Sequence, residues 1–170
     1  HKQINLLYRF RRGKQAGILS GIVSISKKAE LFTEIINLLE VAAASFNILE
    51  EQALQVLQSY QSKSLAQTSS DAKEKLLSCV DNFFKNINNL NIKLENLINA
   101  ADGEEDEEGY IRDGFVILRR LKKMASVMEN FLNSSEFPND VFWFEKIKTS
   151  QGEAVRFIQT PLNLAPIMRR

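Results

Sequence analysis

The chain has 170 residues, of which 44% are hydrophobic and 25% are charged, and its formal net charge is +1. This balance supports a folded core in one domain and excludes both a disordered tail and a protein that is basic throughout. The only cysteine is Cys79 and the only histidine is His1. A disulfide framework, an iron–sulfur or multi-cysteine metal site held by this chain alone, and a histidine-based triad or zinc site are therefore excluded.

Targeting and membrane segments are not predicted. No apolar run approaches the ~20 residues that span a bilayer. The short apolar run at 17–25 is interrupted by polar residues and is not followed by a small-residue cleavage site, unlike a signal peptide. The expected location is the cytoplasm, without membrane contact.

The first 28 residues are strongly basic. Ile4–Phe10 is a candidate short helix, and the glycines after it predict a loop or a broken helix over Arg12–Ser26. No carboxylate precedes Glu30, so a local basic patch is expected despite the nearly neutral total charge. Its cations are Lys2, Arg9, Arg11, Arg12, Lys14, Lys27 and Lys28.

Three long amphipathic helices are predicted next, because apolar residues recur at steps of three and four residues. The first, Lys28–Gln61, has the stripe Leu31, Ile35, Leu38, Ala42, Phe46, Leu49, Ala53, Val56 and Tyr60. The second starts at Ser70 or Asp71, ends near Ala101, and has the stripe Leu76, Val80, Phe83, Ile87, Leu90, Leu94 and Leu97. The third, Tyr110–Asn133, has the stripe Ile111, Phe115, Leu118, Leu121, Ala125, Met128 and Leu132. Short connections, including a polar loop at Ser62–Ser70, predict antiparallel neighbours.

Charge is concentrated around the start of the third helix. Asp102–Glu108 holds six carboxylates in seven residues, but its spacing does not match a calcium-binding loop. It is interpreted as a solvated connector, with a divalent-cation loop and an acidic contact surface as alternatives. The polar face of the third helix carries Arg112, Arg119, Arg120, Lys122 and Lys123. In the second helix, Cys79 is expected to be a small buried residue, since no basic residue flanks it to activate the thiol.

A β-hairpin is predicted in the last stretch, Asp140–Arg170. Two aromatic and β-branched runs flank a turn at Thr149–Gly152. Alternation places Phe142 and Phe144 on one face and Trp143 on the other, so at least one face is core, and these aromatics are candidates for stacking on nucleobases. If the hairpin does not pack on the helices, part of the Phe142–Phe144 face is expected to contact a domain outside this chain. Thr160–Pro161 is expected to open a short final helix.

The predicted fold class is mainly α: an elongated bundle of three long antiparallel helices with a short N-terminal helix and a C-terminal β-hairpin. Residues 1–139 form the bundle, and residues 140–170 form the hairpin and a short terminal helix. No phosphate-binding loop occurs, and the pair Asp140 and Glu145 is weak evidence for acid–base chemistry. The chain by itself is therefore not expected to be an enzyme.

The hairpin resembles a segment of the DinG/XPD-like superfamily 2 DNA helicases. That family has a strand written V-x-W-x-E, followed by P-L-x-[VL]-A and then a motif reading S-A-T. The matching residues here are Val141, Trp143, Glu145, Pro161, Leu162, Leu164 and Ala165. The segment Asn5–Arg9 resembles the L-L-x-R that follows the DEAH box. The resemblance rests on the two ends and implies that the chain is the helical arch inserted between these motor motifs.

On this resemblance, the parent protein is an ATP-dependent DNA helicase with a DNA repair role, and ATP and Mg are bound by its motor domains. The arch helps to form the passage for single-stranded DNA and needs no cofactor of its own; an iron–sulfur cluster in the parent is left open. The expected partners are the motor domains of the same polypeptide and single-stranded DNA. The DNA-binding candidates are Arg9, Arg11, Arg12, Lys14, Lys27, Lys28, Arg119, Arg120, Lys122 and Lys123.

Two other functions stay open from the sequence. The apolar stripes and the acidic segment also suit a helical protein–protein interaction module with no nucleic-acid role. An enzyme subunit that completes a site in a partner is disfavoured, because no convergent polar cluster is evident.

Overall fold

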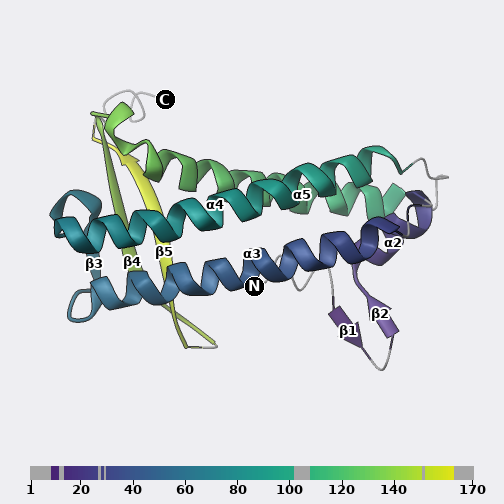
Figure 1. Cartoon of the computed structure of the whole chain (residues 1–170), viewed down its shortest axis with the longest axis horizontal. Helices are drawn as coiled ribbons and strands as arrows, with labels where there is room; N and C mark the ends of the chain where they lie inside the picture. The colour runs from purple at the N-terminus through teal and green to yellow at the C-terminus, as the bar shows by residue number, and fades with distance from the viewer. Residues whose placement is uncertain are drawn as a thin grey trace, which may run out of the picture. The chain divides into compact units, whose positions relative to one another are not determined.

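The computed structural model describes residues 9–11, 14–26, 28, 30–101, 108–150 and 152–162, and only the backbone of 9–11, 14–16 and 108. The chain is mainly helical, as predicted, with four α-helices, a two-stranded sheet and a three-stranded sheet in the described part (Figure 1). It divides into two compact units. The first unit comprises His1–Ala44 and Lys85–Ala125, and the second comprises Ser45–Phe84 and Ser126–Arg170. The sequence-based division at residue 139 stays a prediction.

The three predicted long helices are present as α3 (Glu30–Leu57), α4 (Ser70–Asn99) and α5 (Glu108–Leu132). Each boundary lies within a few residues of the prediction, as is usual for helix ends. In α4 the whole predicted stripe is buried, from Leu76 to Leu97. A single unbroken periodic pattern was therefore enough to identify the core face of this helix.

The stripes of α3 and α5 are partly shifted from the prediction. In α3 the buried residues include Leu39 and Leu57, whereas Tyr60 lies beyond the helix end and is 57% exposed. In α5 the predicted core residue Phe115 is 41% exposed, while Ile117 and Phe131 are buried. Apolar residues at adjacent positions allow more than one 3.6-residue stripe, and packing selects among them.

The N-terminal region differs most from expectation. Strands β1 (Arg9–Arg11) and β2 (Lys14–Ala16) pair antiparallel, and α2 (Ile18–Ser26) follows. The helix expected at Ile4–Phe10 is wrong for Arg9 and Phe10, which lie in β1, and residues 4–8 lie outside the described part. The expectation of a loop or broken helix over Arg12–Ser26 is likewise wrong for Lys14–Ala16, which form β2, and for Ile18–Ser26, which form α2.

A glycine inside α2 has a packing reason. A Cβ atom added to Gly21 would lie 2.5 Å from the ring of Tyr110, and one added to Gly114 would lie 2.6 Å from the Cδ1 atom of Ile22. The two glycines therefore let α2 and α5 approach each other closely in the first unit. Ile22 is fully buried, and this burial supports a helix that glycine propensity alone disfavours.

The predicted hairpin is confirmed in the second unit as β4 (Asp140–Thr149) and β5 (Gly152–Pro161), which pair along their whole length. A third strand, β3 (Ser62–Ser64), joins the other edge of β4, and a 3-10 turn, Leu65–Gln67, follows it. The expected loop at Ser62–Ser70 is therefore wrong for these residues. Thr160 and Pro161 end β5 rather than opening a helix, and residues 163–170 lie outside the described part.

One face of this sheet packs on the helical segments of its own unit. Phe142 is 5% exposed and Phe144 is 0% exposed. The ring of Phe131 in α5 makes edge contacts with Phe142 at 5.2 Å and with Phe157 at 5.5 Å between centroids. The expectation that this aromatic face contacts a domain outside the chain is therefore wrong.

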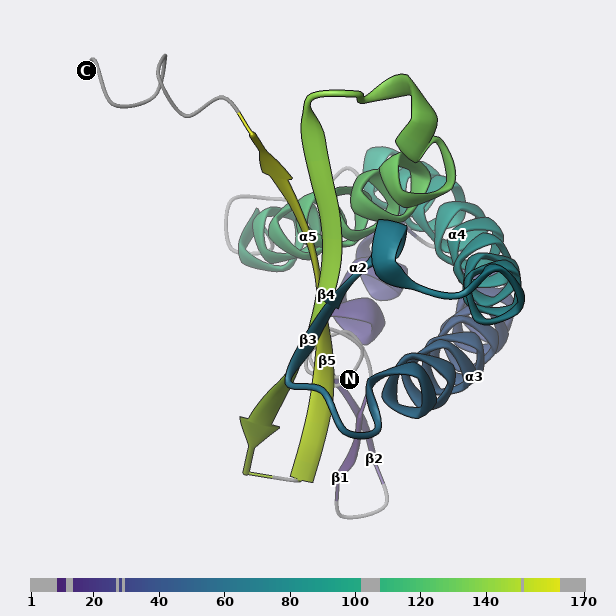
Figure 2. The same ribbon diagram turned by 90° about the vertical axis from the view of Figure 1, so that its left-hand side faces the viewer.

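The other face of the sheet carries Val141, Trp143 and Glu145, which are only partly buried. Figure 2 views the sheet nearly along its plane and shows the helical segments of the second unit on one side of β4. No described helix of this unit covers the opposite side. We call this side, with its paired positions on β3 and β5, the open face.

Candidate nucleic-acid interface

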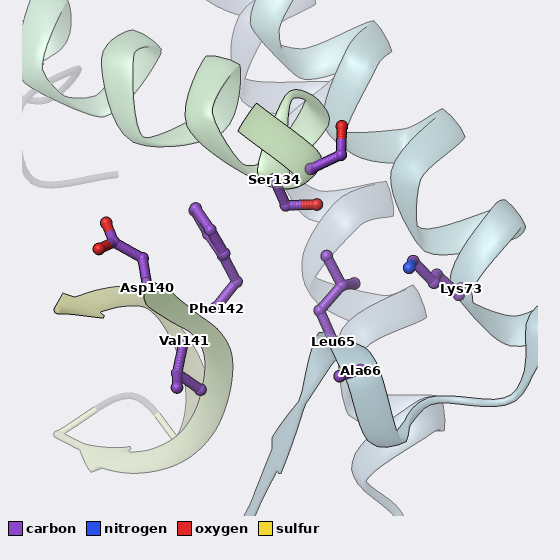
Figure 3. A pocket seen from close by; sticks show the side chains of 8 residues that line it. Leu65, Ala66, Lys73, Ser134, Asp140, Val141 and Phe142 are labelled. Carbon is purple, nitrogen blue, oxygen red and sulfur yellow. The ribbon is translucent and has the colours of Figure 1, made fainter. Parts of the chain in front are cut away.

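Two pockets lie beside the start of β4, both within the second unit. The first has a volume of about 300 Å³. Its apolar part is formed by Leu65 and Phe142, with Lys73 on one side and Asp140 on the other (Figure 3). The Asp140 carboxylate also accepts a hydrogen bond from Gln159 Nε2 at 2.5 Å. Because its lining carries charges of both signs, this pocket has no preference for an anion.

The second pocket lies on the open face and has a volume of about 410 Å³. It is lined by Ser62, Lys63, Ser64, Gln67, Val141, Trp143 and Thr160. These residues come together because Ser64 of β3 and Ile158 of β5 are the register partners of Trp143, while Thr160 pairs with Val141. Lys63 is the register partner of buried Phe144, so its side chain lies on the sheet face opposite Trp143, and the side chains of Ser62, Ser64 and Thr160 make the polar part of the pocket.

The indole ring of Trp143 is fixed on the sheet. Its Nε1–H donates a hydrogen bond to Thr160 Oγ1 at 3.2 Å. The indole nitrogen is a donor only, so this bond satisfies its polar group. What the ring offers to a ligand is its aromatic surface, and the other two aromatics of the hairpin start, Phe142 and Phe144, are buried in the core and cannot stack on a base.

The polar groups around the indole are held by local bonds. Ser64 Oγ accepts a hydrogen bond from the Gln67 N–H at 3.2 Å, which caps the 3-10 turn. The ammonium of Lys63 lies 4.8 Å from the centroid of the Tyr60 ring. On the sheet face that carries Trp143, Glu145 forms an ion pair with Arg156 at 3.2 Å, which offsets its charge.

The eight DNA-binding candidates in the described part of the chain all belong to the first unit. Arg9, Arg11 and Lys14 lie in the β1–β2 hairpin, where Arg11 and Lys14 are direct register partners. Arg12 and Lys27 lie outside the described residues, and Lys28 is exposed.

The four candidates on α5 are all exposed: Arg119, Arg120, Lys122 and Lys123. Lys122 forms an ion pair with Glu95 of α4 at 2.6 Å, which offsets its charge. Arg119 and Lys123 are four residues apart and so lie one above the other on the same side of the helix. The structure thus groups these two cations on one surface of α5.

Sequence reasoning missed the pocket on the open face. The sequence predicts a polar loop at Ser62–Ser70, because three strand residues are too few to show alternation. The alternating pair Ser62 and Ser64 was the only local indication. Trp143 itself was identified as a candidate for stacking.

Other candidate chemistry is limited in the described residues. No cluster of three or more His, Cys, Asp or Glu side chains that could hold a metal ion occurs in the part of the chain that the structure describes. The acidic segment at 102–107 lies outside it. Cys79 is only partly buried, not fully buried as expected, because it lies beside the buried stripe of α4 rather than in it. Its partial burial raises the pKa of the thiol, which lowers the thiolate fraction.

Helix α3 bears on the expectation that no segment of the chain spans a membrane. By length and composition alone it is apolar enough to span a bilayer, with a mean hydropathy of 1.4 over 18 residues, of which 22% are buried. Core helices of soluble proteins meet the same criterion, and in the first unit Ile35 and Leu39 of α3 are buried while Glu34 pairs with Lys93 at 2.8 Å.

Comparison with known proteins found no matching family model, no matching curated protein and no matching solved structure.

Proposed function

We propose that this chain is the helical arch domain of an ATP-dependent DNA helicase of the DinG/XPD-like group, and that it helps to form the passage for single-stranded DNA. ATP and Mg would then be bound by motor domains elsewhere in the same polypeptide. The observation that carries the proposal is the position of the pattern residues Val141, Trp143 and Glu145. All three lie on the open face of the sheet.

The position matters because a sequence pattern can serve either folding or contact. The hairpin is anchored to its own helices by Phe142 and Phe144, which are not part of the V-x-W-x-E pattern. The pattern residues alternate with them and remain partly exposed. A tryptophan and a valine kept on an uncovered sheet face are better explained by contact with a partner than by the core of this chain.

The basic surfaces of the first unit support contact with a phosphate backbone. They include the exposed pair Arg119 and Lys123 on α5, and strands β1 and β2 bring Arg11 and Lys14 to paired backbone positions. Lysine and arginine contacts to phosphates supply most of the affinity for a nucleic acid when sequence is not read. The antiparallel arrangement of the three long helices as an arch belongs to the same proposal.

The test is binding of fluorescently labelled single-stranded DNA by anisotropy, over a series of salt concentrations. For single strands the slope of log K against log salt is about −0.7 per phosphate contact, so Arg119→Glu with Lys123→Glu should flatten the slope by about 1.4. The control, Lys75→Glu with Lys148→Glu, changes the net charge equally at exposed positions of the second unit. Absence of single-strand binding at low salt, or equal effects of both double variants, would refute the proposal.

A helical protein–protein interaction module is the second candidate, favoured by the low burial of apolar α3. In the first unit Val41 of this helix is 49% exposed. This candidate predicts self-association that Val41→Glu weakens in sedimentation equilibrium, together with no single-strand binding at low salt. Salt-sensitive binding of single strands by a monomer would exclude it.

A further inference from the structure

We propose that the exposed side of α5 in the first unit binds a single strand through an aromatic ring set between cations, with Phe115 stacked on a base and Arg119 and Lys123 in contact with phosphates. We call Arg112, Phe115, Arg119 and Lys123 the basic–aromatic row. This inference rests on the proposed function and names the residue that distinguishes a single strand from a duplex.

The four residues of the row share one side of α5. They follow one another at intervals of three and four residues, and residues at these intervals are neighbours on a helix surface. Phe115 therefore lies between two arginines, one turn before it and one turn after it. At 1.5 Å per residue the row extends over about 16 Å of the helix.

Phe115 is left outside the core of the first unit. It is 41% exposed, whereas its neighbours Gly114, Ile117 and Leu118 are buried. Within the described part of the chain, no ring contact or cation–π contact joins Phe115 to another residue. Its ring therefore offers an aromatic surface to a ligand, and a nucleobase of any identity can stack on such a surface.

The cations of the row keep their charge for a partner. Lys122, next to the row, is paired with Glu95 at 2.6 Å. No ion pair joins a cation of the row to another described residue. The acidic stretch at 102–108 directly precedes α5 in the sequence, so we assign the phosphates to the more distant half of the row, at Arg119 and Lys123. Cations beside a stacking ring suit a single-stranded nucleic acid.

The ring and the cations of the row differ in what they recognise. The bases of a duplex are already stacked on one another, whereas those of a single strand can stack on a side chain. The phosphates are accessible in both forms, so Arg119 and Lys123 contact either one. Removing the ring should therefore weaken single-strand binding selectively, and removing a cation should weaken the binding of both forms.

The test compares a labelled thymidine oligomer with a duplex of equal phosphate number, by fluorescence anisotropy at low salt. Phe115→Leu keeps an apolar side chain but removes the aromatic face. It should weaken oligomer binding by about five- to 150-fold, the equivalent of losing one stacked base, and leave duplex binding unchanged. Phe115→Trp should bind the oligomer at least as tightly as the wild type. Arg119→Ala should weaken both and flatten the slope of log K against log salt for the oligomer by about 0.7.

Tyr60→Leu is the matched control. Tyr60 is an aromatic residue of the second unit that is 57% exposed, and the Lys63 ammonium lies 4.8 Å from the centroid of its ring. Its replacement should leave both affinities unchanged. Circular dichroism checks the fold of each variant, and if Phe115→Leu unfolds, Phe115→Trp and Arg119→Ala still decide between stacking and charge alone.

The outcomes separate the row from the proposed function. Wild-type oligomer affinity for Phe115→Leu, with salt-sensitive binding retained, would overturn the stacking contact while the proposed function stands. Equal losses for oligomer and duplex would also overturn it. No binding of the oligomer by the wild type at low salt would overturn both. Polyglutamate binding as tight as oligomer binding would assign the row to an acidic protein segment and overturn the nucleic-acid contact.

Discussion

Asn91 offers the sharpest test of the packing in the first unit. It lies in α4 and is 2% exposed, yet neither its Oδ1 nor its Nδ2 atom has a hydrogen-bond partner among the described residues. The residues one turn away on either side, Ile87 and Leu94, are buried in the core. The helix therefore carries a desolvated amide on its apolar side, and replacing it with leucine should stabilise the protein.

The expected gain follows from the cost of an unsatisfied polar group. Burying an amide without a compensating hydrogen bond costs about 1–3 kcal/mol by protein mutational data, and Asn91→Leu removes this cost. For a chain of this size each kcal/mol changes the melting temperature by about 2–4 °C. We therefore expect Tm to rise by about 2–12 °C and the urea midpoint to rise at an unchanged m-value.

The control is Asn96→Leu, an exposed position on the same helix. Leucine has a better helix propensity than asparagine, and both variants share that benefit of a few tenths of a kcal/mol. The difference between the two variants therefore isolates the buried amide. A loss of stability of about 1 kcal/mol or more for Asn91→Leu relative to the control would mean that the amide is bonded and that the reasoning is wrong.

Three further predictions concern other contacts of the chain. Gly114→Leu should destabilise the first unit by about 1–3 kcal/mol in urea denaturation, because the leucine side chain would overlap Ile22. An unchanged urea midpoint would contradict the close packing of α2 on α5. Glu50→Ala should lower the free energy of unfolding by about 1.5–3 kcal/mol, because the Glu50 carboxylate accepts a 3.1 Å hydrogen bond from the Val155 N–H. Glu51→Ala, at an exposed neighbouring position, is the control. Equal effects of the two variants would refute the contribution of that bond. Burial raises the pKa of the Cys79 thiol, so its alkylation at pH 8 should be slower than that of an unstructured cysteine peptide and should accelerate as pH rises; a rate equal to the peptide's would show that the thiol is not desolvated.

The sequence by itself determined the elements whose signals are local. The stripe of α4 from Leu76 to Leu97 repeats without ambiguity, so both the helix and its buried face could be predicted. The turn residues between the two aromatic runs of the hairpin likewise predicted the pairing of β4 with β5, and strand alternation separated Phe142 and Phe144 from Trp143.

Only the tertiary structure decided the features that depend on residues far apart in sequence. Alternation defines two faces of a strand but does not say which face packs on a helix. In the hairpin it is the face of Phe142 and Phe157, because both rings contact Phe131 of α5. The helix propensity of Gly21 favours a broken helix. A Cβ atom at this position would overlap the ring of Tyr110, so α2 needs a residue without a side chain there. The pocket beside Trp143 required β3, whose three residues carry too little periodicity to predict but pair with β4 once the hairpin is formed. Local propensity is weak at such positions, and the free energy of packing decides them.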